Sequence, residues 1–417
     1  MTALHSDDRR YDRRFVLWLS VGQLISWGSI FYMFALVMEP VERELSMSRA
    51  QASLGFSIAL MAEGLLAYQV GRWIDRGHER LVMTGGSLLL AAALLLHSAI
   101  HSTEGFYLAW LMLGAGMSAT LYSPAFAVVT RRFAHDFRRA IITLTFLGGL
   151  ASTVFIPLTS WLIAQFGWRH ALWWLAAIHL LVCVPLHWRV LRAGSLRGAA
   201  APGFAAAMPA VTPGAGQAPA AVQALGHYLR SAPFLLIGVF VVLMMAITSA
   251  LPAHMISLLR ENGLPETWVI IIPASIGVIQ VVGRALLYFF EHHFDVHMAN
   301  RLIPCLVPLG LAALLAGGGH GWAALLFVLL YGMGNGMMTI VKGTAIAQYV
   351  NRDHVAALNG ALGLPLAFAR ALAPWLMGAL WSREAGYTSC LWFMLAASII
   401  AVFALLLAQR KALPTNN

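Results

Sequence analysis

The sequence predicts an all-α integral membrane protein, with about twelve transmembrane helices in two pseudo-symmetric six-helix bundles. Three observations support this prediction. Of the 417 residues, 60% are hydrophobic and only 11% charged, far from the average of soluble proteins. Apolar runs of about 20 residues, the length that crosses roughly 30 Å of hydrocarbon, recur along the chain. The chain also aligns with itself at an offset of roughly 218 residues.

The apolar runs are continuous and rich in Leu, Ala and Gly, without the period-two alternation of a transmembrane barrel, so each is predicted to be a helix. The first run is long, lacks a small-residue cleavage site and ends at Glu39-Pro40, which favours a retained helix over a signal peptide. The expected spans are 14–37, 50–70, 81–100, 106–130, 138–163, 169–190, 232–258, 266–290, 299–318, 321–348, 355–380 and 387–409.

The basic residues follow this topology. With the N-terminus inside, most Lys and Arg residues fall on the cytoplasmic side, and the exceptions outside are Arg43, Arg49, Arg169, Arg260 and Arg383. This bias is the positive-inside signature, so both termini are expected in the cytoplasm of a multi-pass protein of the inner or plasma membrane. The net charge of +10 is therefore explained by topology, and nucleic-acid binding is not expected.

The internal repeat divides the chain into two halves. The offset places Gly114–Gly116 on Gly332–Gly334. We expect an N-terminal bundle over 1–192, a C-terminal bundle over 232–417, and a cytoplasmic linker over 193–231, which is rich in Ala, Pro and Gly. Two such bundles can rock about a site near the middle of the membrane, which is the basis of alternating access.

The turn after the second span carries a recognisable motif. Gly71, Asp75, Arg76 and Arg80 match the pattern G-x-x-x-D-R-x-G-x-R, although Trp73 stands where leucine is usual and the last spacing differs slightly. The chain therefore resembles the major facilitator superfamily, in which this motif is a conformational latch on the cytoplasmic side of the outward-facing state. The alternative is that these charges only fix the topology.

Within that superfamily the chain resembles the monocarboxylate and oxalate–formate branch. The supporting stretches are 26–29 (SWGS), 148–152 (GGLAS), 167–169 (GWR) and 280–284 (QVVGR), together with Arg370 at the depth where oxalate–formate carriers place a cation. The resemblance implies a secondary transporter of small organic anions.

Three cations lie inside otherwise apolar spans. They are Arg284, Lys342 and Arg370, and the only acid expected at that depth is Glu63. Charges inside a membrane are costly and commonly mark a substrate or ion path. The planar arginine forks suit carboxylates, and the lysine offers a point charge. The alternative is that each base is paired internally, capped on backbone carbonyls, or reaches the cytoplasmic surface.

Glu63 is the candidate for proton coupling, because an isolated carboxyl in an apolar medium is expected to exchange protons near neutral pH. Two alternatives remain open: an ion pair with Lys342 or Arg370, and a hydrogen bond within its own half. The family often places an acid one turn before the arginine at position 284, whereas this chain has Gln280 there.

The resemblance implies that the first, fourth, seventh and tenth helices line the central cavity. His254 titrates near neutrality and could gate the cavity or carry protons, although a structural role is the alternative. The predicted substrate-binding residues are Arg284, Arg370, Lys342, Asn335, Tyr122, Trp27, Gln280 and His254.

No other chemistry is predicted. The sequence offers no nucleophile–base pair, metal-ligand cluster or Walker-type glycine loop, so we expect neither an enzyme nor a metal, cofactor or direct ATP drive. We expect a monomer in the lipid bilayer that moves a mono- or dicarboxylate with protons or in exchange for a counter-anion. The alternatives are a proton-coupled exporter of amphipathic toxic compounds and, from another class, a transporter-like sensor.

Overall fold

The computed structural model describes residues 12–133, 136–191, 226–289, 296–317, 319–351 and 354–412, and these are almost entirely helical. The first half contains α1 (Arg13–Ser26), the π-helix η1 (Trp27–Tyr32), α2 (Phe34–Glu44), α3 (Arg49–Asp75), α4 (Glu79–Ser98), α5 (Thr103–Thr120), α6 (Tyr122–Arg132), α7 (Phe137–Gly149), α8 (Ala151–Ile178), the π-helix η2 (His179–Cys183) and α9 (Val184–Val190). The second half contains α11 (Ala232–Glu261), α12 (Glu266–Phe289), α13 (Val296–Ala316), α14 (Gly321–Tyr349), α15 (Val355–Leu380) and α16 (Thr388–Arg410).

Among the described residues, 11 helical segments are long and apolar enough to cross a membrane. One of them, Arg139–Val190, has 52 residues. As a straight helix it would measure about 78 Å, more than twice the thickness of the hydrocarbon core. Gly167 interrupts it with φ 77° and ψ 161°, a conformation that glycine adopts readily. The segment therefore holds two spans, and the predicted fold of about twelve helices is confirmed.

Several helices differ from their predicted bounds. The first crossing continues to Glu44 instead of ending near residue 37, with η1 in its middle. The predicted span 106–130 is broken at Leu121, whose extended backbone (ψ −162°) separates α5 from α6. Pro124 then lies in the first turn of α6, where its missing N–H costs nothing.

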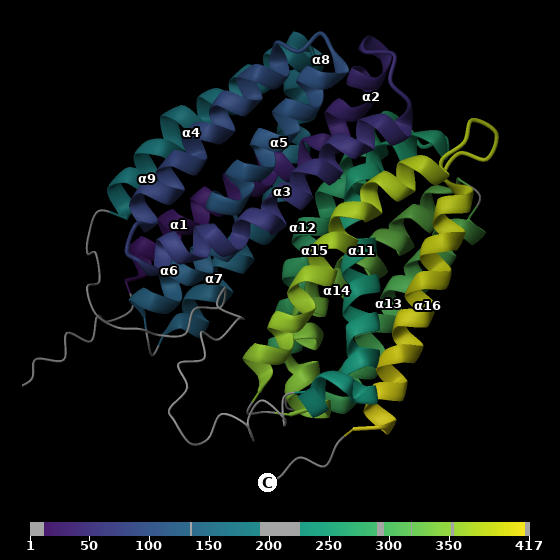
Figure 1. Cartoon of the computed structure of the whole chain (residues 1–417). Coiled ribbons are helices and arrows are strands. Elements are labelled where there is room, and N and C mark those ends of the chain that lie inside the picture. The colour runs from purple at the N-terminus through teal and green to yellow at the C-terminus, as the bar shows by residue number, and fades with distance from the viewer. Residues whose placement is uncertain are drawn as a thin grey trace, which may run out of the picture.

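The two halves lie side by side, α1–α9 in purple to blue-green and α11–α16 in green to yellow (Figure 1). The most extensive contacts between them are those of α3 with α15 and of α8 with α12, and α2 and α7 also contact α11 and α12 respectively. Gly64 is one close approach, since a Cβ there would lie 2.9 Å from that of Ala367. The predicted bundle boundaries remain predictions, and the predicted linker 193–231 lies outside the described residues apart from 226–231.

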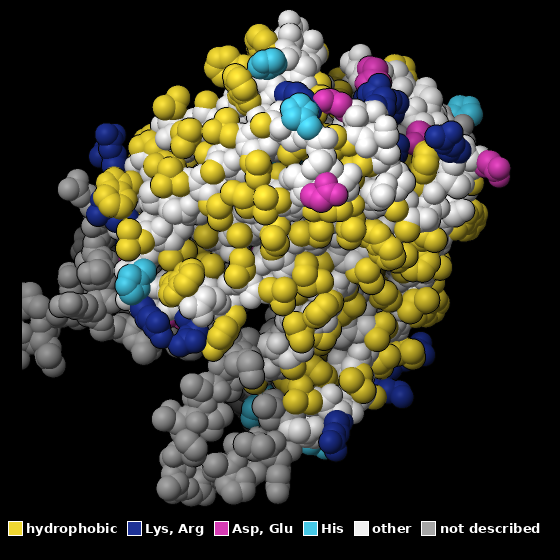
Figure 2. Space-filling view, turned by 45° about the horizontal axis from the view of Figure 1, so that its top comes forward, with side chains coloured by type: hydrophobic (Ala, Val, Ile, Leu, Met, Phe, Trp, Pro, Cys, Tyr) yellow, Lys and Arg dark blue, Asp and Glu magenta, His cyan; other side chains and the backbone are white. Residues whose placement is uncertain are grey.

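The contacts between the halves concentrate toward one face. We call it the closed face, and it is formed where α2 meets α3, α11 meets α12, and α15 meets α16. In Figure 1 the ribbons of the two halves approach each other at this face, at the top, and diverge toward the bottom. Figure 2 shows hydrophobic side chains over the body of the molecule and charged ones gathered toward its ends. This distribution is the one a membrane requires.

Candidate functional site

The π-helix η1 places two aromatic residues at the centre of the molecule. Trp27 and Tyr32 are its first and last residues, and Ser29 between them is fully buried. The Ser29 hydroxyl donates to the carbonyl of Ile25 and lies 2.8 Å from Nε2 of His179, the first residue of η2. Because the hydroxyl's proton is engaged by that carbonyl, His179 is the donor to Ser29. A hydrogen bond thus joins the two π-helices, which are rare and frequently mark functional sites.

Arg284 of α12 lies near these aromatic residues. Its Nε donates to the Gly336 carbonyl at 2.9 Å, and its Nη1 donates to the Thr145 carbonyl at 2.8 Å. The guanidinium also interacts electrostatically with Tyr32 and Tyr122. Trp27 lies on Tyr122, with 5.0 Å between ring centroids. We call Trp27, Tyr32, Tyr122 and Arg284 the Arg284 cluster; it combines residues from three separate crossings.

The two backbone carbonyls fix the orientation of the Arg284 guanidinium. This is the alternative, left open by the sequence, in which the base is capped on backbone carbonyls. They leave Nη2 without a hydrogen bond inside the described part of the chain. Carbonyls are dipoles and do not neutralise the charge, so Arg284 keeps both its positive charge and donors for an anion.

A second group, the Arg370 cluster, contains Glu63, Lys342 and Arg370. Arg370 Nη2 lies 3.6 Å from Glu63 Oε2, with 31% and 14% of the two side chains exposed. Lys342 interacts electrostatically with Arg370. Over the ranges that the structure describes, the Lys342 ammonium has no hydrogen bond or ion pair. Glu63 is therefore paired rather than isolated, which is one of the two alternatives left open by the sequence.

Three other predicted residues are placed differently. Asn335 of α14 is half-buried. Gln280 is only 6% exposed, where α12 crosses α14 so closely that a Cβ at Gly336 would lie 2.7 Å from the Gln280 Cα. His254 has no exposed surface and lies between the two halves near the closed face.

The surroundings of His254 define its tautomer. Nε2 lies 3.0 Å from the Pro374 carbonyl, which can only accept, so Nε2 carries the proton. Nδ1, at 2.9 Å from the Tyr387 hydroxyl, then accepts from it. Tyr387 in turn accepts from Arg49 of the other half. His254 is thus part of a polar network across the closed face, and its predicted contact with substrate stays a prediction.

The predicted latch residues lie on the opposite face, at the C-terminal end of α3. Asp75 and Arg76 are exposed, and Gly71 is buried. Arg80 lies over the Trp188 ring of its own half at 3.3 Å. Among the described residues no hydrogen bond, ion pair or cation–π contact joins Asp75, Arg76 or Arg80 to the C-terminal half. These residues therefore make no such contact across the boundary between the halves, and their role as a latch stays a prediction.

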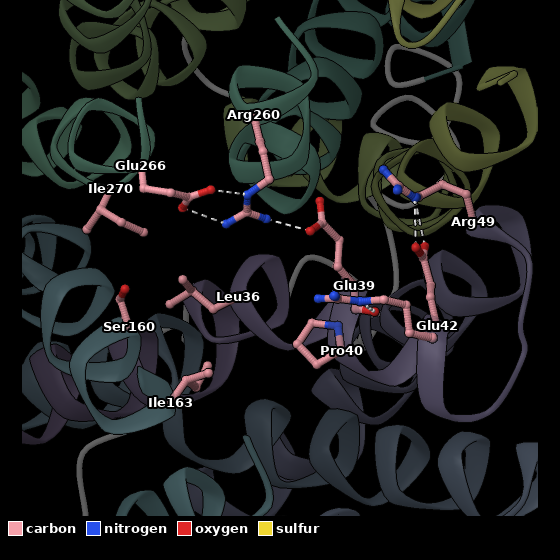
Figure 3. Close-up of a pocket in the computed structure, with 11 residues that line it drawn as sticks. Leu36, Glu39, Pro40, Glu42, Arg49, Ser160, Ile163, Arg260, Glu266 and Ile270 are labelled. Atoms are coloured by element: carbon pink, nitrogen blue, oxygen red, sulfur yellow. Dashed lines mark hydrogen bonds and ion pairs between the residues drawn. The ribbon is translucent and has the colours of Figure 1, made fainter. Parts of the chain in front are cut away.

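The charged residues of the closed face were not recognised from the sequence as functional, because there they look like ordinary loop charges. A cavity of about 600 Å³ opens there between the halves. In Figure 3, Arg260 lies between Glu266 and Glu39, and Arg49 faces Glu42. Arg49 is only 9% exposed, so it is a buried charge that hydropathy did not reveal. The available signal was the repeated occurrence of an acid–base pair between the first two crossings of each half.

The described residues contain no group of three or more His, Cys, Asp or Glu residues that could hold a metal ion. Cys183 and Cys390 are buried and Cys305 is partly buried, and all three are free.

Comparison with known proteins gives consistent results. A family model described as Major Facilitator Superfamily matches residues 19–299. Monocarboxylate transporter 13 from Bos taurus is 32% identical over 171 residues, and its counterpart from Rattus norvegicus is 31% identical over the same length. The matched segment covers 40% of this chain and 38% and 37% of those proteins, so the chain spans well under half the length of these relatives.

Solved structures share the fold over almost the whole chain. The nucleoside transporter NupG superposes with a TM-score of 0.74 at 14% identity, covering 95% of this chain and 99% of that one. A bacterial homologue of the human drug peptide transporters PepT1 and PepT2 gives 0.69 at 14% identity, with 95% and 97% covered. A bacterial homologue of the human lysosomal transporter Spinster gives 0.67 at 15% identity, with 96% and 97% covered. At these identities the likeness shows the fold alone.

Proposed function

Since the chain belongs to the Major Facilitator Superfamily, we propose that it is a secondary transporter that moves a small organic anion, a mono- or dicarboxylate, by alternating access. The observation that carries the proposal is the charge balance near the centre of the molecule. Within the described residues, Arg284, Lys342 and Arg370 face one acid, Glu63, and only Arg370 is paired with it. An anion entering between the clusters would offset the cost of burying these charges, whereas a cation would increase it.

The two clusters suit different tasks. The Arg284 fork is held by main-chain carbonyls and flanked by aromatic rings, so it is arranged to bind a carboxylate while the rings of Trp27 and Tyr122 contact the body of the substrate. Lys342 supplies a second charge. The name of the partly matched relatives, monocarboxylate transporter 13, agrees with a carboxylate substrate.

Glu63 is the proposed site of proton coupling. While ionised, its carboxylate competes with the substrate for Arg370. Protonation would break this ion pair and free the Arg370 guanidinium, so that a proton and an anion favour each other's binding. Such mutual dependence is what proton-linked anion transport requires.

The positive-inside bias supports a sidedness for this model. The closed face would be extracellular, with both termini in the cytoplasm of the cell membrane. The conformation would then be inward-open, with the cytoplasmic latch of Asp75, Arg76 and Arg80 released.

The test is proton movement in proteoliposomes that contain the purified protein and a trapped pH dye, while a panel of mono- and dicarboxylates is added outside. We expect a pH change with at least one anion, abolished by Arg284→Gln. Arg383→Gln is the matched control, because Arg383 is exposed on the closed face. If preloaded exchange is also silent with every anion, the proposal fails; binding of cationic amphipathic compounds would then favour an exporter, and ligand binding without flux a sensor.

A further inference from the structure

Each half carries an ion pair at its closed-face end. In the first half Arg49 Nε lies 2.8 Å from Glu42 Oε1, and in the second half Arg260 Nε lies 2.6 Å from Glu266 Oε1. Each pair joins the end of the first crossing of its half to the start of the second. The repeat offset of roughly 218 residues places Glu42 on Arg260 and Arg49 next to Glu266. The pairs therefore occupy equivalent positions with their charges exchanged.

Each arginine also has a partner in the opposite half. Arg49 Nη1 lies 3.3 Å from Glu261 Oε1 of α11. Arg260 Nη1 forms a short ion pair with Glu39 Oε2 of α2. Figure 3 shows the Arg260 guanidinium with Glu266 on one side and Glu39 on the other. Each arginine is thus divided between a same-half and a cross-half carboxylate.

We propose that Glu39, Glu42, Arg49, Arg260, Glu261 and Glu266 form a reversible gate in which each arginine keeps its same-half carboxylate when the halves separate and loses only the cross-half one. Opening a buried ion pair is costly because it leaves a buried charge without a partner. Here the arginines stay paired in both states, and the released Glu39 and Glu261 carboxylates enter water. The gate deepens the alternating-access proposal, because it names what holds this face shut.

The same-half acids have a second effect. Glu266 belongs to the second half and lies on the same guanidinium as Glu39 of the first half, so the two carboxylates repel across the boundary. Glu42 likewise interacts with Glu261 of the opposite half. The cross-half acids therefore hold the face shut, and the same-half acids oppose closure.

The two sides of the gate differ in burial. Arg49 is enclosed by Trp381, 4.7 Å from the ring centroid, and by the Tyr387 hydroxyl. Arg260 is 38% exposed and its partner Glu266 is 65% exposed. The Arg260 side is therefore the better place for substitutions, because the fold tolerates them there.

Glu39→Gln and Glu266→Gln each remove one negative charge from the same arginine, yet they should shift the conformational equilibrium in opposite directions. Glu39→Gln removes a cross-half attraction and should increase opening. Glu266→Gln removes a cross-half repulsion and should decrease it. For partly exposed ion pairs we expect changes of about two- to fivefold in the open-to-closed ratio.

The experiment measures distances between spin labels at Glu104→Cys and Glu384→Cys, which are exposed on the closed-face side of the two halves. The native cysteines Cys183, Cys305 and Cys390 are first replaced, and the protein is placed in lipid nanodiscs without substrate. Each variant is measured alone and together with Arg49→Gln. This substitution weakens the buried side of the gate and should raise the open population enough for a decrease to be measured.

We expect a long-distance population that rises with Glu39→Gln and falls with Glu266→Gln. Arg43→Gln is the matched control, since Arg43 is exposed on the same face and, in the part of the chain that the structure describes, its side chain bonds only the carbonyl of Glu39 in its own half. Shifts in the same direction, no shift, or a face that stays closed even with Arg49→Gln would overturn the gate. Because no anion is present, failure of the carboxylate proposal would appear separately, in the proteoliposome assay.

Discussion

Glu63 of α3 and Arg370 of α15 face each other across the boundary between the two halves, with 3.6 Å between Oε2 and Nη2. This pair has a structural counterpart on the other side of the molecule. There Arg284 of α12 reaches across the boundary to the Thr145 carbonyl of α7. The pseudo-two-fold arrangement therefore places one arginine of the second half against each of the two contact surfaces of the first half. Movement of the halves would change the surroundings of both arginines at once.

The first prediction concerns Glu63→Gln. Glutamine cannot change its charge with pH, so anion binding should no longer depend on a proton at this position. We expect uptake driven by a pH gradient to fall by about tenfold or more, the size of an ordinary coupling free energy. Exchange of internal for external anion should continue, because Arg370 remains free to bind. Both activities are measured with the same preparation in proteoliposomes. Equal loss of exchange and gradient-driven uptake would show that Glu63 is structural.

The second prediction concerns close helix packing at Gly114. A Cβ there would lie 2.2 Å from the carbonyl oxygen of Ala59 and 2.6 Å from its Cα, and backbone atoms cannot move aside as a side chain can. We expect Gly114→Ala to lower the free energy of unfolding by about 1–3 kcal/mol through overpacking. Gly85→Ala is the control, since nothing lies within 4 Å of a Cβ there. Thermal unfolding in detergent checks both; equal behaviour of the two variants would contradict the packing argument.

The third prediction concerns the latch. Asp75 is exposed and, among the described residues, has no partner in the C-terminal half, so this conformation does not depend on it. Asp75→Asn should therefore weaken only the opposite conformation, in which the latch is engaged. The closed-to-open ratio at the Arg49 face should rise by about two- to fivefold, as for a partly exposed ion pair. It is measured together with Arg49→Gln, so that the open population is large enough for a decrease to be seen. The spin-label distances at positions 104 and 384 measure it, and a rise in the long-distance population would contradict it.

The fourth prediction concerns Tyr387, which lies just outside the last membrane span. Burial raises the pKa of its hydroxyl, so the folded protein holds this proton to a higher pH than the unfolded chain does. Above the ordinary tyrosine value of about 10, the unfolded state therefore releases the proton first, and stability must fall as pH rises.

Replacement by phenylalanine removes this alkaline loss. At pH 8 Tyr387→Phe should be less stable by about 1–3 kcal/mol, because it leaves Arg49 and His254 without their shared partner. The difference from the parent protein should shrink between pH 10 and pH 11. Thermal unfolding against pH gives the result, with Tyr68→Phe, at an exposed position, as control. A constant difference over the whole range would show that Tyr387 does not titrate with folding.

The sequence determined the fold class, because the membrane requires long apolar helices and the two-fold internal repeat can be seen by aligning the sequence with itself. It also located Arg284, Lys342, Arg370 and Glu63, since charges inside apolar runs stand out by composition alone. The latch motif was visible for the same reason, as a local pattern of charges in one turn.

Tertiary structure decided the partners of these residues. That Glu63 meets Arg370, that main-chain carbonyls hold Arg284, and that His254 lies in the closed face depend on how α3, α11, α12 and α15 pack. These contacts join residues far apart in the chain. The periodicity of apolar residues indicates only that a helix face is buried; it does not indicate which other helix covers that face. The gate could not be predicted for the same reason. In the sequence Arg49 is one of several charged residues in a polar turn, and it becomes a buried contact between the halves only when the two six-helix bundles meet.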